Sequence, residues 1–450
     1  MVKKEETLTR KLIRVALPIS AQSLISTSLN LVDNLMVGHL GETELAAVGL
    51  STQFSFIFWM VLFGFVGGTI TYMSQFYGKN DMASIRRVTG IAITIAFCIG
   101  LAFFSVSFFA PDVVLGIYTN IPEVIDMGRP FMRTLSFIFL TWSIVVPLTA
   151  ALKATQQTSL PLKISIVVFG TNTALGIILI NGFFGAPRMG IMGAAVANVT
   201  SKCLELLLFL IVIFVKRNVV AGPIREFFGW TRGLFARVLA NAVPTMANES
   251  LWGIGISLYN AAYGRVGVTE VAAVQASNTI HNMFSVACFS IGDAMLILCG
   301  EHLGRGELDK AREAARRILR MAVVVGLIAG AGVILTAKPL AGLYNLTAAG
   351  SRDAVLILLI YGAVLFVKIH NSTILTGALR AGGDTRVGLA IDLGSVYFVG
   401  VPMAFLGALA FHLPIYFVVL LVQAEELVKF FFMRWRFRKE VWIRDLVEDL

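Results

Sequence analysis

Long apolar runs constrain this chain more than any other feature. The stretch IAITIAFCIGLAFFSVSFFA (91–110) contains no charged residue. A transmembrane helix needs about 20 predominantly apolar residues to cross the hydrocarbon core of a bilayer. Similar runs recur along the whole chain, and only 14% of its residues are charged, whereas soluble proteins are about 25% charged. The sequence therefore predicts an all-α polytopic membrane protein.

The apolar runs suffice for twelve transmembrane helices, and the charges orient them. Of the 37 Lys and Arg residues, 28 lie at or beyond the helix ends on the side of the N-terminus, six lie at or beyond the opposite helix ends, and three lie deep inside helices. The positive-inside rule then predicts that both termini are cytoplasmic, in a cell (plasma or inner) membrane. The expected helices are 12–37, 45–77, 88–109, 131–150, 161–182, 191–215, 237–263, 270–300, 317–337, 354–378, 387–409 and 413–434.

The net charge of +10 has an explanation in this topology. Basic residues concentrated on the cytoplasmic side are attracted to anionic lipid headgroups. We therefore expect membrane lipid as a partner and no nucleic acid.

The chain contains an internal repeat with an offset of 226 residues. LGETELAAVG (40–49) aligns with VGVTEVAAVQ (266–275), and Pro18 aligns with Pro244. Six helices separate the copies, an even number, so both halves have the same orientation and a pseudo-two-fold axis along the membrane normal relates them. Some secondary transporters have this parallel-repeat arrangement and handle substrate between the halves. The predicted organisation is a six-helix lobe at 1–214, a cytoplasmic linker at 215–233 and a second six-helix lobe at 234–450.

A polar stripe on the first helix is the first candidate site. Its members follow at steps of four, four and three, and they are Gln22, Ser26, Asn30 and Asp33. A polar stripe facing lipid is unfavourable, so this one should face the protein interior or a water-filled cavity. Gln and Asn also serve as bridges between helices. A buried carboxylate can take up a proton near neutral pH or coordinate sodium, so Asp33 is the candidate for cation coupling.

The second half does not copy this stripe, because Asp33 aligns with Tyr259. The seventh helix instead carries Glu249 one turn before Trp252. This divergence suggests that one lobe binds the ion and the other the substrate, or that each holds its own cation site. The other polar candidates for a substrate cavity are Asn278, His281, Asn282 and Asn371.

Several charges are expected to have structural roles. Lys202 and Glu205 are three residues apart and can pair, and Glu426 and Lys429 repeat this spacing with the signs reversed. Lys368 is a candidate for a cross-helix pair with Asp392, and Asp384 is expected in a cytoplasmic turn with Arg380 and Arg386.

Four motifs carry a resemblance to a known family. ALPISAQSL (16–24), VDNLMVGHLGETELAAVG (32–49), GIMGAAVAN (190–198) and GALRAGGDT (377–385) resemble the multidrug and toxic compound extrusion (MATE) family. The resemblance spans nearly the whole chain. It implies two six-helix lobes and export of organic, often cationic, compounds driven by inward flow of H⁺ or Na⁺.

The resemblance also implies roles for individual residues. In prokaryotic members an Asp at the end of the first helix is tied to cation coupling, and Asp33 matches it. The fifth helix of those members commonly reads Asn-x-x-x-Asp, but here Asn172 is followed by Gly176. Another branch places a coupling Glu in the seventh helix, where Glu249 lies about one turn out of register. The helix 10 Asp of that branch has no counterpart here, although Asn371 is nearby.

These observations predict an antiporter that exports small organic, cationic compounds by alternating access, coupled to H⁺ or Na⁺. The alternative is a flippase for a lipid-linked saccharide or lipid of the same superfamily, but buried acids outnumber buried bases and favour cationic cargo. An enzyme is not expected, because the sequence has no metal cluster, no Ser–His constellation and no phosphate-binding loop with its lysine. We expect a monomer without a cofactor, and no metal other than Na⁺ at Asp33 or Glu249. The predicted coupling residues are Asp33, Asn30, Asn172 and Glu249, and the predicted cavity residues are Gln22, Ser26, Trp252, Tyr259, Asn278, His281, Asn282 and Asn371.

Overall fold

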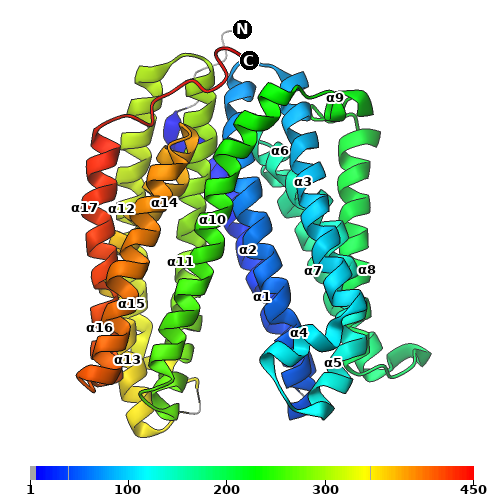
Figure 1. The fold of residues 1–450 in the computed structure, drawn as a ribbon, viewed down its shortest axis with the longest axis vertical. Coiled ribbons are helices and arrows are strands. Elements are labelled where there is room, and N and C mark those ends of the chain that lie inside the picture. Colours follow the sequence, from blue (N-terminus) through cyan, green and yellow to red (C-terminus); the bar gives the residue numbers. More distant parts are fainter. Residues whose placement is uncertain (1–6, 39, 345) are drawn as a thin grey trace. The chain divides into compact units, whose positions relative to one another are not determined.

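The computed structural model describes residues 7–38, 40–344 and 346–450. Throughout these ranges the regular elements are helices (Figure 1), as the apolar runs predict.

The first half of the chain follows the expected helices, with short additions between them. Its elements are α1 (Leu8–Gly38), α2 (Glu42–Gly78), α3 (Met82–Phe109), α4 (Pro111–Tyr118), α5 (Pro122–Leu135), α6 (Phe137–Ala154), α7 (Ser159–Asn181), η1 (Phe183–Gly185), α8 (Ile191–Leu210), η2 (Ile211–Val215) and α9 (Ile224–Phe228). The short helix α4 was not predicted. Pro111 and Pro122 occupy the first positions of α4 and α5, where a missing N–H and a fixed φ favour helix initiation.

The helices of the second half of the chain are interrupted more often than those of the first. Its elements are α10 (Arg232–Tyr263), α11 (Val268–Gly304), α12 (Leu308–Ala341), α13 (Ala348–Ser372), η3 (Thr373–Leu379), α14 (Thr385–Ser395), η4 (Val396–Gly400), α15 (Val401–Phe405), η5 (Leu406–Ala410), α16 (Ile415–Val422) and α17 (Ala424–Arg438). The segments η3, η4 and η5 are π-helical turns, a feature often found at functional sites.

Ten helical stretches of the described chain are long and apolar enough to cross a membrane. The two expected helices outside this set are 237–263 and 413–434. They lie in α10 and in α16–α17, and both carry charged residues that the structure buries or half-buries, including Glu249 and Lys429. Their low hydropathy therefore reflects polar groups that pack inside the protein.

The chain forms two compact units. Unit 1 comprises residues 1–20, 74–80 and 243–450, and unit 2 comprises residues 21–73 and 81–242. The expected linker at 215–233 includes α9 and belongs to unit 2. Each unit thus contains most of one predicted lobe, and the division into lobes stays a prediction.

The two halves repeat local backbone and side-chain geometry. A Cβ on Gly41 would lie 2.3 Å from Oε2 of Glu44, and a Cβ on Gly267 would lie 2.2 Å from Oε2 of Glu270. Each helix start therefore places a glutamate against a glycine, at positions that the offset of 226 residues aligns. The absence of a Cβ makes both contacts fit.

An ion pair is repeated in the same way. Arg86 Nη1 lies 2.5 Å from Glu226 Oε2, and Arg312 Nε lies 2.9 Å from Glu440 Oε2. The two arginines align at the same offset, and each pairs with a glutamate that follows the last predicted transmembrane helix of its own half.

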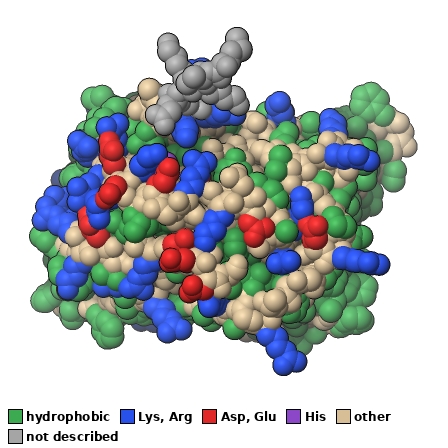
Figure 2. All heavy atoms as spheres, turned by 90° about the horizontal axis from the view of Figure 1, so that it is seen from above, with side chains coloured by type: hydrophobic (Ala, Val, Ile, Leu, Met, Phe, Trp, Pro, Cys, Tyr) green, Lys and Arg blue, Asp and Glu red, His purple; other side chains and the backbone are tan. Residues whose placement is uncertain are grey.

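A C-terminal strap, residues 439–450, follows α17 along the surface of unit 1 (Figure 1). Trp442 is fully buried and stacks on Phe437 with ring centroids 5.7 Å apart. A Cβ on Gly382 would lie 1.4 Å from the Trp442 carbonyl oxygen, so only glycine allows the strap to approach this closely. Figure 2 shows the face at this end, on which many Lys and Arg side chains are exposed.

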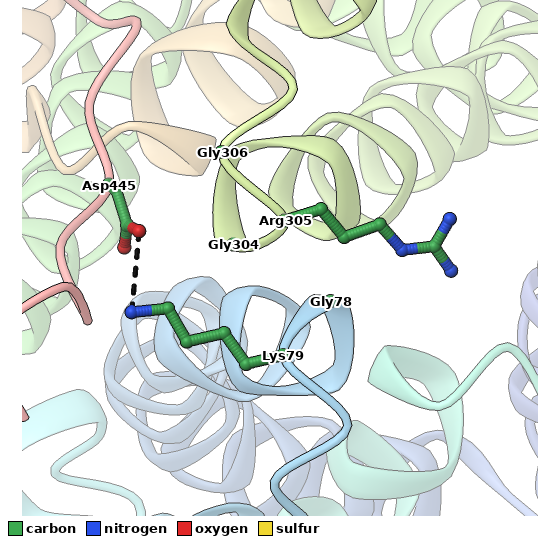
Figure 3. A pocket seen from close by; sticks show the side chains of 6 residues that line it. All are labelled: Gly78, Lys79, Gly304, Arg305, Gly306 and Asp445. Carbon is green, nitrogen blue, oxygen red and sulfur yellow. Dashed lines mark ion pairs between the residues drawn. The ribbon is translucent and has the colours of Figure 1, made fainter.

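The end of α2 holds the strap. Lys79 Nζ donates a 2.6 Å hydrogen bond to the Val447 carbonyl and lies 3.4 Å from Asp445 Oδ2. A hollow of about 530 Å³ opens beside this contact, and Figure 3 shows Lys79 pointing toward Asp445 while Arg305 points away from it. The hollow is lined by Gly78, Lys79, Gly304, Arg305, Gly306 and Asp445. None of the predicted site residues lines it.

Candidate functional site

The Asp33 cluster, made of Asp33, Asn172 and Asn198, lies inside unit 2. Asn172 Nδ2 donates a 2.9 Å hydrogen bond to Asp33 Oδ1, and Asn198 Nδ2 donates a 3.2 Å hydrogen bond to Asp33 Oδ2. Helices α1, α7 and α8 each contribute one residue. Two neutral amides thus bind both carboxylate oxygens, an arrangement that stabilises the charged form without a directly bonded cation.

A small residue on α7 lets α1 approach the cluster. A Cβ on Gly176 would lie 2.9 Å from Cε of Met36. Met36 follows Asp33 by about one helical turn and fills the space beside Gly176, the position at which the resemblance to the MATE family implies a second acid. The departure at Gly176 therefore has a packing reason.

The structure describes the side chains of two further residues of the polar stripe, Gln22 and Ser26. Gln22 Nε2 donates a 3.3 Å hydrogen bond to Ser165 Oγ, so the stripe meets α7 at Ser165 as well as at Asn172. Ser26 Oγ bonds to the Gln22 carbonyl of its own helix at 3.1 Å. The side chain of Asn30 lies outside the described residues. The roles predicted for the stripe stay predictions.

A buried ion pair lies on the same helix as Asn198. Lys202 Nζ is 2.8 Å from Glu205 Oε2, as the spacing predicted. The ammonium also lies over the Trp142 ring, 5.2 Å from its centroid. Both side chains are largely removed from water. The opposite charges cancel, so the pair as a whole is neutral.

Replacing both members of this pair with neutral side chains should affect stability more than transport. We expect Lys202→Met with Glu205→Gln to lower the free energy of unfolding modestly, because a cation–π contact is worth about 1 kcal/mol and the lost pair is replaced by neutral groups. The specific efflux rate should stay largely intact. Thermal unfolding and efflux in liposomes measure the two effects, and abolished transport in a well-folded double variant would assign the pair a role in coupling.

In unit 1, Glu249 forms an ion pair with Arg380. Arg380 was expected in a cytoplasmic turn with Asp384. It follows the π-helical turn η3, and its side chain is only 4% exposed. The sequence did not predict this burial. Asp384 of the same loop pairs instead with Arg436, at 2.6 and 2.9 Å. Glu249 is therefore neutralised by a buried guanidinium, and its coupling role stays a prediction.

The Lys429 cluster, made of Lys429, Asp392, Glu425 and Glu426, is a second polar centre of unit 1. Lys429 Nζ lies 2.9 Å from Asp392 Oδ1, 3.5 Å from Glu425 Oε1 and 3.8 Å from Glu426 Oε1. The candidate pair between Lys368 and Asp392 is therefore wrong. The expected proximity of Glu426 and Lys429 is present.

Neutral donors bind the outer oxygens of this cluster. Asn248 Nδ2 donates to Asp392 Oδ2 at 3.1 Å, and Asn371 Nδ2 donates to Glu426 Oε2 at 2.9 Å. The Tyr259 hydroxyl donates to Glu425 Oε2. Tyr259 and Asn371, both predicted to line a substrate cavity, are buried and bonded to the acids of α17.

The remaining predicted cavity residues lie on α10 and α11. Trp252 packs, partly buried, against the apolar core that includes Tyr259. Asn278 accepts a 3.0 Å hydrogen bond from Tyr361, and the His281 ring lies 4.8 Å from the Tyr361 ring. Asn282 is exposed. Their role in a substrate cavity stays a prediction.

Sequence reasoning missed Asn198 and Arg380 as site residues. A signal was present for Asn198, since Asn198, Lys202 and Glu205 follow at steps of four and three and share one face of α8. The sequence contains no comparable signal for Arg380, because its pairing with Glu249 depends on the geometry of the π-helical turn η3.

Buried ionisable groups inside long apolar helices are typical of membrane transporters. The chain belongs to a family of such transporters, the MatE family. The family model matches residues 18–178 and 244–406, and the starts of these two matches are separated by the offset of the internal repeat. The chain is therefore a transporter of the MATE family, not an enzyme.

Similar proteins cover nearly the whole chain. The uncharacterized transporter YisQ of Bacillus subtilis (strain 168) is 24% identical and covers 98% of this chain and 97% of its own. A probable multidrug resistance protein NorM of Rhizobium meliloti (strain 1021) is 26% identical over 90% of this chain and 86% of its own.

Two solved structures show the same fold. A transporter of the MOP superfamily from Pyrococcus furiosus has a TM-score of 0.87 at 18% identity and covers 97% of both chains. The Vibrio cholerae MATE transporter VcmN in its bent form has a TM-score of 0.86 at 20% identity, and covers 97% of this chain and 98% of its own. The predicted all-α polytopic fold class is confirmed.

Proposed function

We propose that this transporter exports small organic, cationic compounds in exchange for an inward-moving cation, H⁺ or Na⁺. The observation that carries the proposal is the Asp33 carboxylate, which two neutral amides hold inside a helical bundle. Relatives that are named as multidrug resistance proteins, such as NorM, support export of this class of compound.

The cluster can respond to a proton through its amides. Protonation of Asp33 removes its charge and turns one oxygen from an acceptor into a donor. Asn172 can rotate its amide to present Oδ1, which has no hydrogen-bond partner among the described residues. Asn198 keeps a 3.2 Å bond to the Ala194 carbonyl of its own helix. The contacts of α1 with α7 and α8 would thus differ between the two states of Asp33, which is what a cation needs to shift a conformational equilibrium.

The same acid explains exchange with cationic cargo. An ionised Asp33 attracts an organic cation, and a neutralised Asp33 does not. Cargo and coupling ion would therefore compete for one negative charge, and binding of the ion favours release of the cargo.

The flippase alternative has less support. A lipid-linked pyrophosphate needs basic side chains that are available to its charges. The buried bases Arg380 and Lys429 and the half-buried Lys202 each have an acidic partner. The relatives named above as multidrug resistance proteins also favour the exporter.

Purified protein in liposomes, loaded with a fluorescent organic cation, tests the proposal. A pH gradient and a sodium gradient are imposed separately, with protein-free liposomes as the control. We expect one of the two gradients to drive efflux of the dye. Equal dye retention with and without either gradient would contradict cation-coupled export.

The topology proposed for the chain has its own test. We propose a monomer in the cell membrane with both termini cytoplasmic, in line with the Lys and Arg side chains on the end shown in Figure 2. Single cysteines at positions 216 and 188, in protein freed of the exposed Cys98 and Cys203, should react with impermeant reagent from opposite sides. Labelling from the same side would contradict the twelve-helix topology.

A further inference from the structure

The charges of the Lys429 cluster do not balance. Lys429, Asp392, Glu425 and Glu426 are each no more than 7% exposed, and one ammonium faces three carboxyl groups. Fully ionised, the cluster would hold two uncompensated negative charges away from water. Like-charged carboxyl groups that share a buried site do not all ionise.

The geometry of the cluster separates its three acids. Asp392 makes the shortest contact with Lys429, at 2.9 Å, and therefore takes the ammonium as its counter-ion. Glu425 and Glu426 lie farther from it, at 3.5 and 3.8 Å. Their outer oxygens accept hydrogen bonds from the Tyr259 hydroxyl and the Asn371 amide nitrogen. The hydroxyl can equally accept a hydrogen bond from a protonated Glu425, and Asn371 can accept one from a protonated Glu426 after its amide turns.

Backbone packing crowds the outer oxygen of Glu425, Oε2. A Cβ on Gly400 would lie 2.0 Å from the Tyr259 hydroxyl and 2.4 Å from Glu425 Oε2. The π-helical turn η4 thus presses its glycine onto the hydrogen bond between these two groups and leaves no room for a further group.

The surroundings contribute little net charge. The Glu249–Arg380 pair is neutral as a unit, and His370 bonds to Asn371 and lies against the Phe430 ring. Arg434 is exposed at the surface of α17. The titratable and charged groups around the cluster, by element, are Glu249, Tyr259 and Tyr263 of α10, Tyr361 and His370 of α13, Arg380 after η3, Asp392 of α14, and Glu425, Glu426, Lys429 and Arg434 of α17.

A small cavity lies beside Asn248, one hydrogen bond away from the cluster. It has a volume of about 10 Å³, close to the minimum for one water molecule. Asn248, which bonds to Asp392, lines this cavity with its Oδ1 unbonded among the described residues. Its other lining residues are Thr245, Leu375, Arg380, Thr385 and Leu389.

We propose that the Lys429 cluster is a second, proton-binding site, in which Glu425 and Glu426 carry at least one proton at neutral pH and exchange it with water at Asn248. A water in the cavity supplies the proton and receives it back. Asp392 takes up this proton when its hydrogen bond to Asn248 opens and admits the water, because an amide N–H does not itself relay protons. Lys429 then gives one ammonium proton to Glu425 and takes the Asp392 proton in the same step, so the charge of the ammonium is unchanged. The proposal depends neither on the exported compound nor on the coupling role of Asp33.

Infrared difference spectroscopy of the purified protein tests the proposal. A protonated carboxylic acid has a carbonyl band that is separate from the carboxylate bands and shifts in D₂O. At neutral pH we expect this band in the wild-type protein, a shift of it when glutamate is labelled with ¹³C at the side-chain carboxyl, and its loss or weakening in Glu425→Gln or Glu426→Gln. Glu205→Gln is the matched control, because Glu205 forms a one-to-one ion pair with Lys202. This replacement should leave the band unchanged.

Two further results complete the test. Asn248→Leu should slow the D₂O-induced shift of the band several-fold, since it removes the amide beside the cavity. Absence of a protonated glutamate band in the labelled wild-type protein at neutral pH would overturn the proposal, even if the variants failed to fold. An unchanged exchange rate in well-folded Asn248→Leu would overturn the assigned route.

Discussion

Asp33→Asn should fold as the wild-type protein does and lose gradient-driven efflux. Asparagine has nearly the shape of a neutral aspartic acid, so the contacts to Asn172 and Asn198 can be kept after reorientation of the amides. It carries no proton to exchange and no charge to attract a cation. The expected result is a loss of coupled efflux to near the protein-free level, with thermal stability within about 1 kcal/mol of the wild type, since no buried charge is left unpaired.

Asp112→Asn is the matched control for this variant. Asp112 is exposed and pairs with Arg129 at 2.6 Å, and an exposed pair contributes about 0–1 kcal/mol. Its replacement should leave efflux unchanged. Wild-type rates in monodisperse Asp33→Asn protein would show that Asp33 only bridges helices, and would direct attention to Glu249 in unit 1.

Lys429→Met should cause the largest loss of stability among single replacements. It removes the counter-ion of three buried acids, and leaving a buried ion-pair partner uncompensated costs about 3–5 kcal/mol. The acids can escape this penalty only by binding protons. The loss should therefore be smaller at acidic pH and larger at alkaline pH, in contrast to a simple packing defect.

Thermal unfolding in detergent across a pH series measures this effect. Lys202→Met is the matched control, because it leaves one buried acid, Glu205, without its partner and should give a smaller loss with a weaker pH dependence. A loss in Lys429→Met that is independent of pH would show that packing of the lysine stem, not its charge, holds α14 and α17 together.

Most of the fold could be predicted from the sequence, because helix length and the repeat can be read along a single chain. Apolar length gave the helices, and the repeat gave two halves. Helical spacing placed Asp33 on a polar face, and the resemblance to the MATE family grouped Asn172 with it as a coupling residue.

Cross-helix partners could not be predicted in the same way. The residue that meets Asp392 depends on how α14 and α17 rotate about their axes, and one sequence does not fix that rotation. Lys368 and Lys429 were equally available partners by composition, and the structure selects Lys429. The burial of Arg380 could not be predicted for a similar reason, because the π-helical turn η3 that precedes it has no signature in the pattern of apolar residues.

The repeated ion pair bears on how the chain originated. Arg86 pairs with Glu226 and Arg312 pairs with Glu440, and in both cases the glutamate lies beyond the sixth helix of its half. An ancestral gene of half the present length would thus already have encoded a segment after its sixth helix that formed an ion pair with its third helix. Duplication and fusion would have turned one copy of that segment into the connection between the halves, and the other into the strap that follows α17. By this account the connection and the strap are descendants of one ancestral tail.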